Sequence, residues 1–283
     1  MKLRVIFFFV LFFSVNLFAE LSVVSPFSVI TQPDSNSIKN SGTINGVYLS
    51  SGTLAYLSEF SYSYSDLRYK ESTTNLEQND FYFSYSRYFF NHSYKIALHT
   101  IATSDTNLQN GSTFIIGYSR WNYFGTTKLT YGIDFYHSFY TNGLDLNEEK
   151  KAISLNQLTG YISYFKPFKS ISNVLSLKVN YENALTYNKN YFSFSLKNIV
   201  YYKKVSLELG YFGGKMQTGV MDGGATVYNS KDMLHKKIQA KVSYSIIPSL
   251  KINTAYSSTL LDEYLSKKSL NNAAITFGIV YIK

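Results

Sequence analysis

Cysteine is absent from this chain, and proline and tryptophan are scarce, with 4 and 1 residues among 283. Without cysteine there is no disulfide framework and no thiolate metal site. Beyond the first residues, no apolar run approaches the ~20 residues that a transmembrane helix needs. These absences argue against a disulfide-stapled protein, a cysteine-ligated zinc protein and a helical membrane protein.

The first residues have the pattern of a secretory signal peptide. Lys2 and Arg4 give a basic start, an apolar run follows, and Ala19 supplies a small residue before Glu20. We therefore predict a signal peptide over residues 1–19, cleaved after Ala19. An uncleaved anchor is less favoured because the apolar run is short for a helical span. Loss of Lys2 and Arg4 lowers the formal net charge from +9 to about +7.

Residues that favour β-strands dominate the remainder, with 27 Tyr and 22 Phe. In the segment 79–100, side chains of two kinds alternate. Phe81, Phe83 and Tyr85 alternate with Tyr82, Ser84 and Ser86. Successive side chains of a strand point to opposite faces, so one face of this segment is apolar and the other is polar. The same alternation recurs to the last residue in about twelve segments.

The connections between these segments alternate between long and short. This pattern is typical of outer-membrane barrels, in which long external loops alternate with tight periplasmic turns. We predict an all-β fold, a transmembrane antiparallel up-and-down β-barrel of about 12 strands over residues 45–283, with both termini periplasmic. Residues 20–44 are rich in Ser, Asn and Thr, contain Pro26 and Pro33 and lack a period, which predicts an N-terminal periplasmic tail or plug segment.

Alternation alone does not distinguish lipid outside a barrel from the core of a soluble sandwich. The order of residues along the strands favours lipid, because tyrosine concentrates near both ends of the apolar faces and aliphatic residues lie between, as in an aromatic girdle. Arg87 and Arg120 share the apolar parity, but both fall near predicted periplasmic ends, where a charge can reach the interface. The predicted girdle comprises Tyr56, Tyr62, Tyr64, Tyr94, Tyr118, Tyr164, Tyr181, Tyr211, Tyr244, Tyr256 and Tyr281.

Charged residues occupy the opposite parity, which faces inward in a barrel. With Glu59, the predicted pore-lining residues are Lys95, Lys128, Asp134, Lys178, Glu182, Lys197, Glu208, Lys237, Lys241 and Lys251. Lysines outnumber acids in this set, and a wall of one sign favours ions of the other sign. The set therefore predicts a mildly anion-favouring pore, although the same charges could also pair with one another and fill a closed barrel.

The last strand resembles the C-terminal signal strand of Gram-negative outer-membrane β-barrels. Thr276, Gly278 and Tyr281 match its polar, glycine and aromatic positions, whereas Lys283 replaces the usual terminal aromatic residue. The resemblance implies a porin-like protein of unassigned subfamily, recognition by the barrel-assembly machinery and residence in the bacterial outer membrane. Its partners would be outer-membrane lipid and lipopolysaccharide and small solutes. Nucleic acid is not an expected partner of an exported chain.

Enzymatic clusters are not found in the sequence. His137 and Ser138 are adjacent, so in a strand they point to opposite faces and cannot share a proton as in a barrel lipase. Asp134 and Asp145 with His137 lack the spacing of a barrel protease. The oxygen-rich loop 142–149 could hold a divalent cation, but a solvated loop tip is the simpler interpretation. We expect no enzyme activity, no cofactor and no metal site.

The predicted function is a porin-like passive channel for small polar or anionic solutes. The alternative is a closed structural or adhesive barrel that acts through the long loops at 66–80, 140–154 and 213–234. A soluble periplasmic β-protein is a third possibility and would purify without detergent. Glycine pairs at 213–214 and 223–224 mark the longest loop, and we hypothesise that this loop folds into the pore and constricts it.

Overall fold

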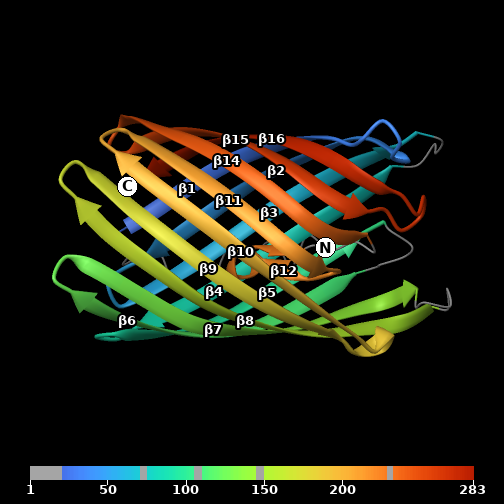
Figure 1. Cartoon of the computed structure of the whole chain (residues 1–283), viewed down its shortest axis with the longest axis horizontal. Coiled ribbons are helices and arrows are strands. Elements are labelled where there is room, and N and C mark those ends of the chain that lie inside the picture. The colour runs from blue at the N-terminus through green and yellow to red at the C-terminus, as the bar shows by residue number, and fades with distance from the viewer. Residues whose placement is uncertain (1–20, 71–74, 105–109, 145–149, 228–231) are drawn as a thin grey trace.

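The chain forms a closed antiparallel β-barrel of fourteen strands in the computed structural model, which describes residues 21–70, 75–104, 110–144, 150–227 and 232–283 (Figure 1). The predicted signal peptide lies outside the described residues. No helix in the described part of the chain is long and apolar enough to cross a membrane. The barrel strands are β1 (Leu21–Gln32), β2 (Lys39–Gly52), β3 (Tyr56–Tyr69), β4 (Leu76–Tyr88), β5 (His92–Thr103), β6 (Gly111–Phe124), β7 (Thr127–Leu144), β8 (Lys150–Phe168), β9 (Ile171–Ala184), β10 (Lys189–Tyr202), β11 (Val205–Met216), β14 (Met233–Ile247), β15 (Leu250–Asp262) and β16 (Ser269–Ile282).

All twelve predicted segments are strands of this barrel, but the predicted number of about 12 is too low by two. The additional strands are β1 and β2, so the prediction of a tail or plug over residues 20–44 is wrong. β1 pairs with β16 and closes the barrel. In this ladder Val24 pairs with Tyr281 and Phe27 pairs with Gly278, and the pairing is interrupted at Pro26. Proline lacks the N–H that a ladder needs, and for this reason the sequence pattern did not predict a wall strand here.

The connections differ between the two ends of the barrel. At one end, the six connections from β2–β3 to β14–β15 contain two or three residues, and at the other end the connections contain four to sixteen. We call these the short-turn end and the long-loop end. Leu21 and Lys283 both lie at the short-turn end, where the Ser22 N–H donates to the Lys283 carbonyl at 3.3 Å. Pro248 lies in a short turn, as predicted.

The apolar face of the strands forms the outside of the barrel. Ile162, Leu177 and Leu196 are register partners on β8, β9 and β10, and each keeps 40–44% of its surface exposed. Residues of the other parity, such as Glu182 and Asp134, are buried on the inner wall. A sandwich core would bury the apolar face instead. The apolar belt on the outside therefore fits a barrel that stands in lipid.

A charge on this belt should destabilise the barrel far more than a charge on the inner wall. We expect Leu177→Arg to lower the free energy of unfolding in phospholipid vesicles by about 2–4 kcal/mol, because the guanidinium would face acyl chains near mid-depth. The neighbouring substitution Ser176→Arg points into the lumen and is the matched control. Denaturant unfolding of the two variants measures the difference, and equal losses would contradict the outward orientation of Leu177.

Candidate functional site

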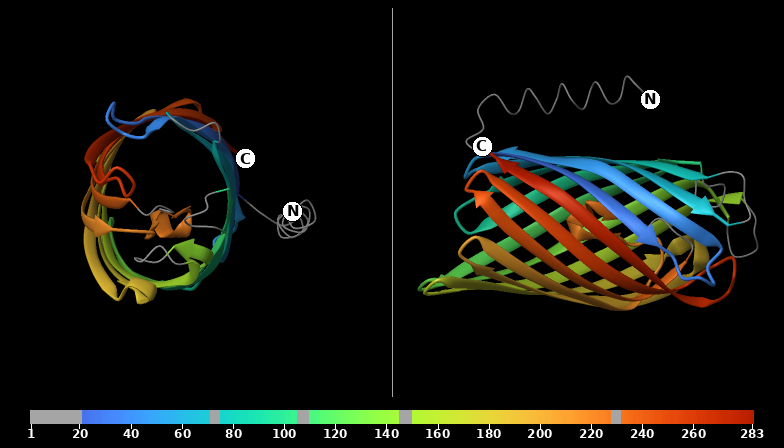
Figure 2. Two further views of the ribbon diagram at one scale, coloured as in Figure 1. Left: turned by 90° about the vertical axis from the view of Figure 1, so that its right-hand side faces the viewer. Right: turned by 90° about the horizontal axis from the view of Figure 1, so that it is seen from above.

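The connection between β11 and β14 folds into the barrel instead of projecting from it. Its described residues 217–227, which we call the plug, contain β12 (Val220–Met221), a short 3₁₀ turn η3 (Asp222–Gly224) and β13 (Thr226–Val227). β12 and β13 pair as a two-stranded sheet of their own. Figure 2 shows the plug crossing the lumen from the β11 and β14 wall toward β4 and β5. The hypothesis that this loop folds inward is confirmed for residues 217–227, and that it constricts a pore stays a prediction.

Hydrogen bonds attach the plug to the wall formed by β4 to β8. The Gln157 side chain donates to the Val220 carbonyl at 2.8 Å, and its oxygen accepts the Val220 N–H at 2.7 Å. The Lys95 ammonium donates to the Gly223 carbonyl at 2.9 Å. Nδ1 of His99 lies 2.8 Å from the Gly224 carbonyl. These bonds satisfy plug backbone groups that would otherwise be buried without partners.

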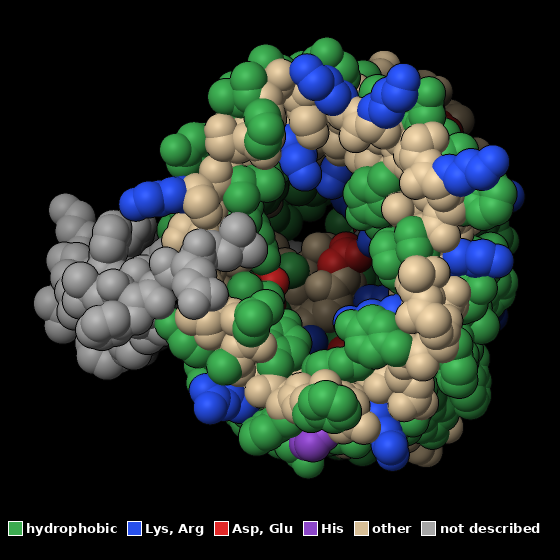
Figure 3. Space-filling model, turned by 90° about the vertical axis from the view of Figure 1, so that its left-hand side faces the viewer, with side chains coloured by type: hydrophobic (Ala, Val, Ile, Leu, Met, Phe, Trp, Pro, Cys, Tyr) green, Lys and Arg blue, Asp and Glu red, His purple; other side chains and the backbone are tan. Residues whose placement is uncertain are grey.

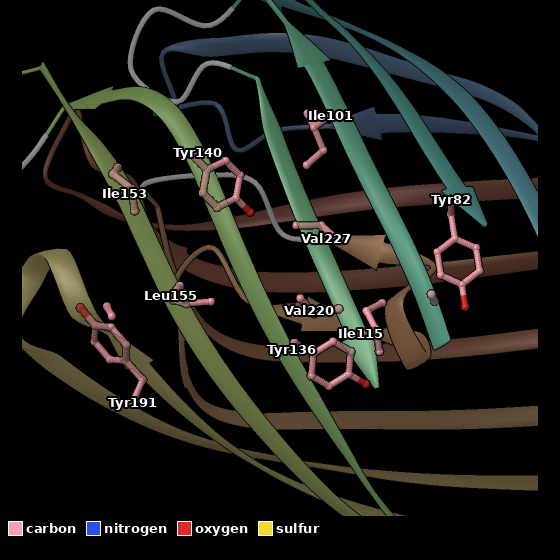
Figure 4. Close-up of a cluster of buried hydrophobic side chains, with 12 residues drawn as sticks. Tyr82, Ile101, Ile115, Tyr136, Tyr140, Ile153, Leu155, Tyr191, Val220 and Val227 are labelled. Carbon is pink, nitrogen blue, oxygen red and sulfur yellow. The ribbon is translucent and has the colours of Figure 1, made fainter. Parts of the chain in front are cut away.

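A hydrophobic cluster forms between the plug and the same wall (Figure 4). Val220 and Val227 of the plug pack against buried side chains from β4 to β10, and Ile115 and Leu155 have no exposed surface. The other members are Tyr82, Ala97, Ile101, Tyr136, Tyr140, Ile153, Ala184 and Tyr191. Burial of this apolar surface gives the plug a fixed seat on one side of the lumen.

Gly224 allows the plug to approach the wall closely. Its φ is +106°, and a Cβ added there would lie 2.1 Å from Cδ1 of Ile115. We expect Gly224→Val to lower the free energy of unfolding, measured by denaturant titration, by about 1–3 kcal/mol through overpacking against Ile115. Gly160→Val is the control, since no atom lies within 4 Å of a Cβ at Gly160. Equal effects of the two substitutions would argue against the tight seat.

A polar cluster at the long-loop end holds the residues that follow the plug. Asp232 forms an ion pair with Lys39 and accepts the Tyr264 N–H at 2.9 Å. Glu263, whose side chain is buried, accepts hydrogen bonds from Ser37 at 2.5 Å and Ser266 at 2.6 Å. The β1–β2 and β15–β16 connections are thereby tied to the C-terminal end of the β11–β14 connection.

The opposite side of the lumen contains a basic cavity of about 500 Å³. The plug borders it through Val220, Met221, Asp222 and Gly223, and strands β7 to β11 and β14 supply its wall. Its charged residues are Lys178, Lys197, Glu208, Lys237, Lys241 and Asp222. Figure 3 looks into the short-turn end and shows that the barrel is hollowed there, with basic and acidic side chains inside. We call this space the basic cavity.

The predicted pore-lining residues divide into four groups. Lys178, Lys197, Glu208, Lys237 and Lys241 border the basic cavity. Lys95 and Asp134, 3.5 Å apart, border a second cavity of about 240 Å³ together with Glu59. Glu182 faces inward but is buried beneath the plug, where it accepts the Gln217 N–H at 3.3 Å. Lys128 and Lys251 border neither cavity, and the Lys128 ammonium lies 4.8 Å from the Trp121 ring centroid.

The predicted girdle tyrosines all lie on the outer wall. Seven of them are exposed: Tyr94, Tyr118, Tyr164, Tyr211, Tyr244, Tyr256 and Tyr281. The other four, Tyr56, Tyr62, Tyr64 and Tyr181, are half-buried. Several contact aromatic neighbours across strands, as Tyr94 does with Tyr118, whose ring centroid lies 5.3 Å away. That these rings mark the two membrane borders stays a prediction.

Two site features escaped the sequence analysis. Asp222 was not recognised as part of the lumen because it lies in a connection and not in a strand. The apolar seat of the plug was also missed, although Ile115 and Ile153 carry a signal, since both are apolar on the polar parity of their strands. The rejected lipase pair behaves as expected: His137 is exposed outside and bonds Asn156 at 2.8 Å, whereas Ser138 is buried inside beside Thr113.

No protein-family model matches the sequence, and no curated protein matches it either. Solved structures do match. The toluene transporter TbuX of Ralstonia pickettii has a TM-score of 0.53 at 11% identity, over 93% of this chain and 89% of that one. Omp33, an outer membrane protein of Acinetobacter baumannii, has a TM-score of 0.50 at 8% identity, over 92% and 98%. A bacterial polysaccharide outer membrane secretin has a TM-score of 0.53 at 8% identity, over 93% and 98%.

The fold is that of an outer-membrane β-barrel. These likenesses extend over nearly the whole barrel, so they concern the wall and not a local motif. At identities of 8–11%, these likenesses show a shared fold and not a shared function.

Proposed function

We propose that this outer-membrane β-barrel is a porin-like passive channel that favours small polar and anionic solutes. The basic cavity is the observation that carries the proposal, because four lysines and two acids border it beside the plug. A confined lumen with excess positive charge raises the local concentration of anions. The internal plug supports a narrow pore and not a wide one. In this proposal the short-turn end faces the periplasm, as in bacterial barrels generally.

The same proposal specifies how the chain reaches the outer membrane and what it contacts there. The predicted signal peptide directs export, and the barrel-assembly machinery inserts the chain into the outer membrane. The apolar belt contacts acyl chains, and the long-loop end meets lipopolysaccharide. No catalytic role is assigned to any residue.

Reversal potentials in planar bilayers with unequal KCl concentrations on the two sides would test the function. We expect measurable conductance and a reversal potential whose sign indicates that chloride passes more readily than potassium. A clear preference for potassium would contradict the proposal.

A closed structural or adhesive barrel is the second candidate. The hydrophobic cluster favours it, since it fills part of the lumen with packed side chains. A liposome swelling assay with a small sugar separates the two candidates. Swelling at the rate of protein-free liposomes would support the closed barrel.

A further inference from the structure

The basic cavity contains more positive charge than its own acids neutralise. Lys197 forms an ion pair with Glu208 at 3.3 Å, and Glu208 lies opposite Lys241 in the register of β11 and β14. In the described part of the chain, Lys178, Lys237 and Lys241 form no ion pair within 4.0 Å. Uncompensated ammonium groups in a confined space are a binding site for an anion.

Asp222 of the plug borders the same cavity as these lysines. The ammonium groups of Lys197, Lys237 and Lys178 act on it electrostatically. Burial alone would raise the pKa of Asp222, but these three cations outweigh burial and hold the pKa below its ordinary value. The carboxylate is therefore ionised at neutral pH.

The backbone of the plug is built to place this carboxylate. Asp222, Gly223 and Gly224 have φ values of +50°, +70° and +106°, so three consecutive residues are left-handed. Such a conformation is uncommon for a residue with a Cβ, and aspartate is one of the few that tolerate it. Backbone of this kind persists where the surrounding structure holds it, often at sites that bind ligands. Here the anchors are the Lys95 and His99 contacts to Gly223 and Gly224.

The remaining lining of the basic cavity is mixed, with apolar side chains such as Leu196, Phe212 and Met221 beside polar ones. Ser176, Ser195 and Gln239 contribute hydroxyl and amide groups, which can bond the hydroxyls of a solute. The volume of about 500 Å³ is within the range of small-molecule sites. Ammonium groups select a carboxylate or a phosphate, and the hydroxyl and amide groups select a hydroxylated carbon frame.

We propose that the basic cavity is a binding subsite for small hydroxylated oxyanions, and that Asp222 is a fixed negative charge at its border that weakens their binding. This proposal rests on the proposed channel function. When the cavity is empty, Asp222 partly neutralises it. When an anionic solute enters, it binds Lys178 and Lys237 directly, and the carboxylate of Asp222 opposes its binding from the border of the cavity.

Single-channel recording in KCl tests the proposal with three probes: gluconate, glucose 6-phosphate and glucose. We expect the two anions to reduce the chloride conductance of the full chain saturably, and glucose to have no effect. In Asp222→Asn, the concentration that gives half-maximal reduction should fall several-fold, because the negative charge that opposes anion binding is lost. In Lys237→Gln it should rise several-fold. A response to gluconate alone or to glucose 6-phosphate alone would support the subsite and identify the oxyanion it prefers.

The control Glu77→Gln removes the same charge from an exposed position near the long-loop end of β4. It should leave the half-maximal concentration unchanged. An unchanged concentration in Asp222→Asn, or an equal effect of glucose, would overturn the subsite while leaving the channel intact. Absence of any conductance in the unsubstituted protein would instead contradict the channel function, so the two failures are distinguishable.

Discussion

Deletion of residues 220–229 from the plug is expected to raise single-channel conductance several-fold. The deletion removes β12, η3 and β13, which cross the lumen and are the only described segment that does so. Eight-stranded barrels are filled by their own side chains, but interior width grows with strand number, so fourteen strands without a plug leave a wide aqueous lumen. Conductance rises with the cross-section of the aqueous path.

The barrel wall should survive this deletion. All fourteen wall strands pair with wall neighbours, and the plug supplies none of those pairs. The six residues that remain between β11 and β14 suffice to connect Met216 to Met233, because Met216 is already the register partner of Leu234. Circular dichroism of the purified barrel would check that the strands persist.

A length-matched control distinguishes two effects of the plug: its presence in the lumen and its attachment to the wall. Replacement of residues 220–229 by ten glycine and serine residues keeps the length but removes the Gln157 and hydrophobic contacts. This variant should give an intermediate, fluctuating conductance as the free segment moves. Conductance equal to that of the unsubstituted protein in both variants would show that the plug does not limit the passage.

In the proposed channel, reversal of charge on the basic wall should convert anion preference to cation preference. In Lys178→Glu/Lys237→Glu/Lys241→Glu, three cations of the basic cavity become anions, and Asp222 and Glu208 remain. The wall is then negatively charged, and it concentrates potassium and excludes chloride. We expect the reversal potential in a KCl gradient to change sign, and the change to shrink at high salt because screening shortens the range of the wall charges.

The matching control places the same substitutions outside the lumen. Lys169, Lys203 and Lys204 are exposed in short turns, and their conversion to glutamate changes the net charge of the protein equally. Since these residues do not border the basic cavity, the reversal potential should keep its sign. A sign change in the control, or none in the lumen variant, would show that the basic cavity does not set selectivity.

The alternation of side chains predicted the twelve strands from β3 to β16 because their outer faces are consistently apolar. It did not predict β1, whose apolar residues lie on both faces: Val24 and Ile30 are exposed outside, whereas Phe27 pairs with Gly46 on the inner side. Pro26 strengthened the wrong interpretation, since proline is rare in paired strands. β1 is a wall strand because β16 and β2 need partners, and that is a property of the closed sheet and not of the segment.

The inward position of the lysines followed from parity, but their grouping did not. Lys178 and Lys237 border one cavity, while Lys95 and Glu182 hold the plug, and only the position of the plug separates these roles. That position depends on contacts such as Gln157 with Val220, which are 63 residues apart in the chain. A single sequence with local patterns contains no signal for such a pairing, apart from apolar residues such as Ile115 on the inner parity.

The seam between β1 and β16 has a consequence for biogenesis. Because the earliest and the latest wall strands are partners, the cylinder cannot close until both have been delivered, and every shorter intermediate carries two open edges that invite wrong partners. The proline in β1 weakens hydrogen bonding at this junction, so lateral opening of the finished cylinder should begin there.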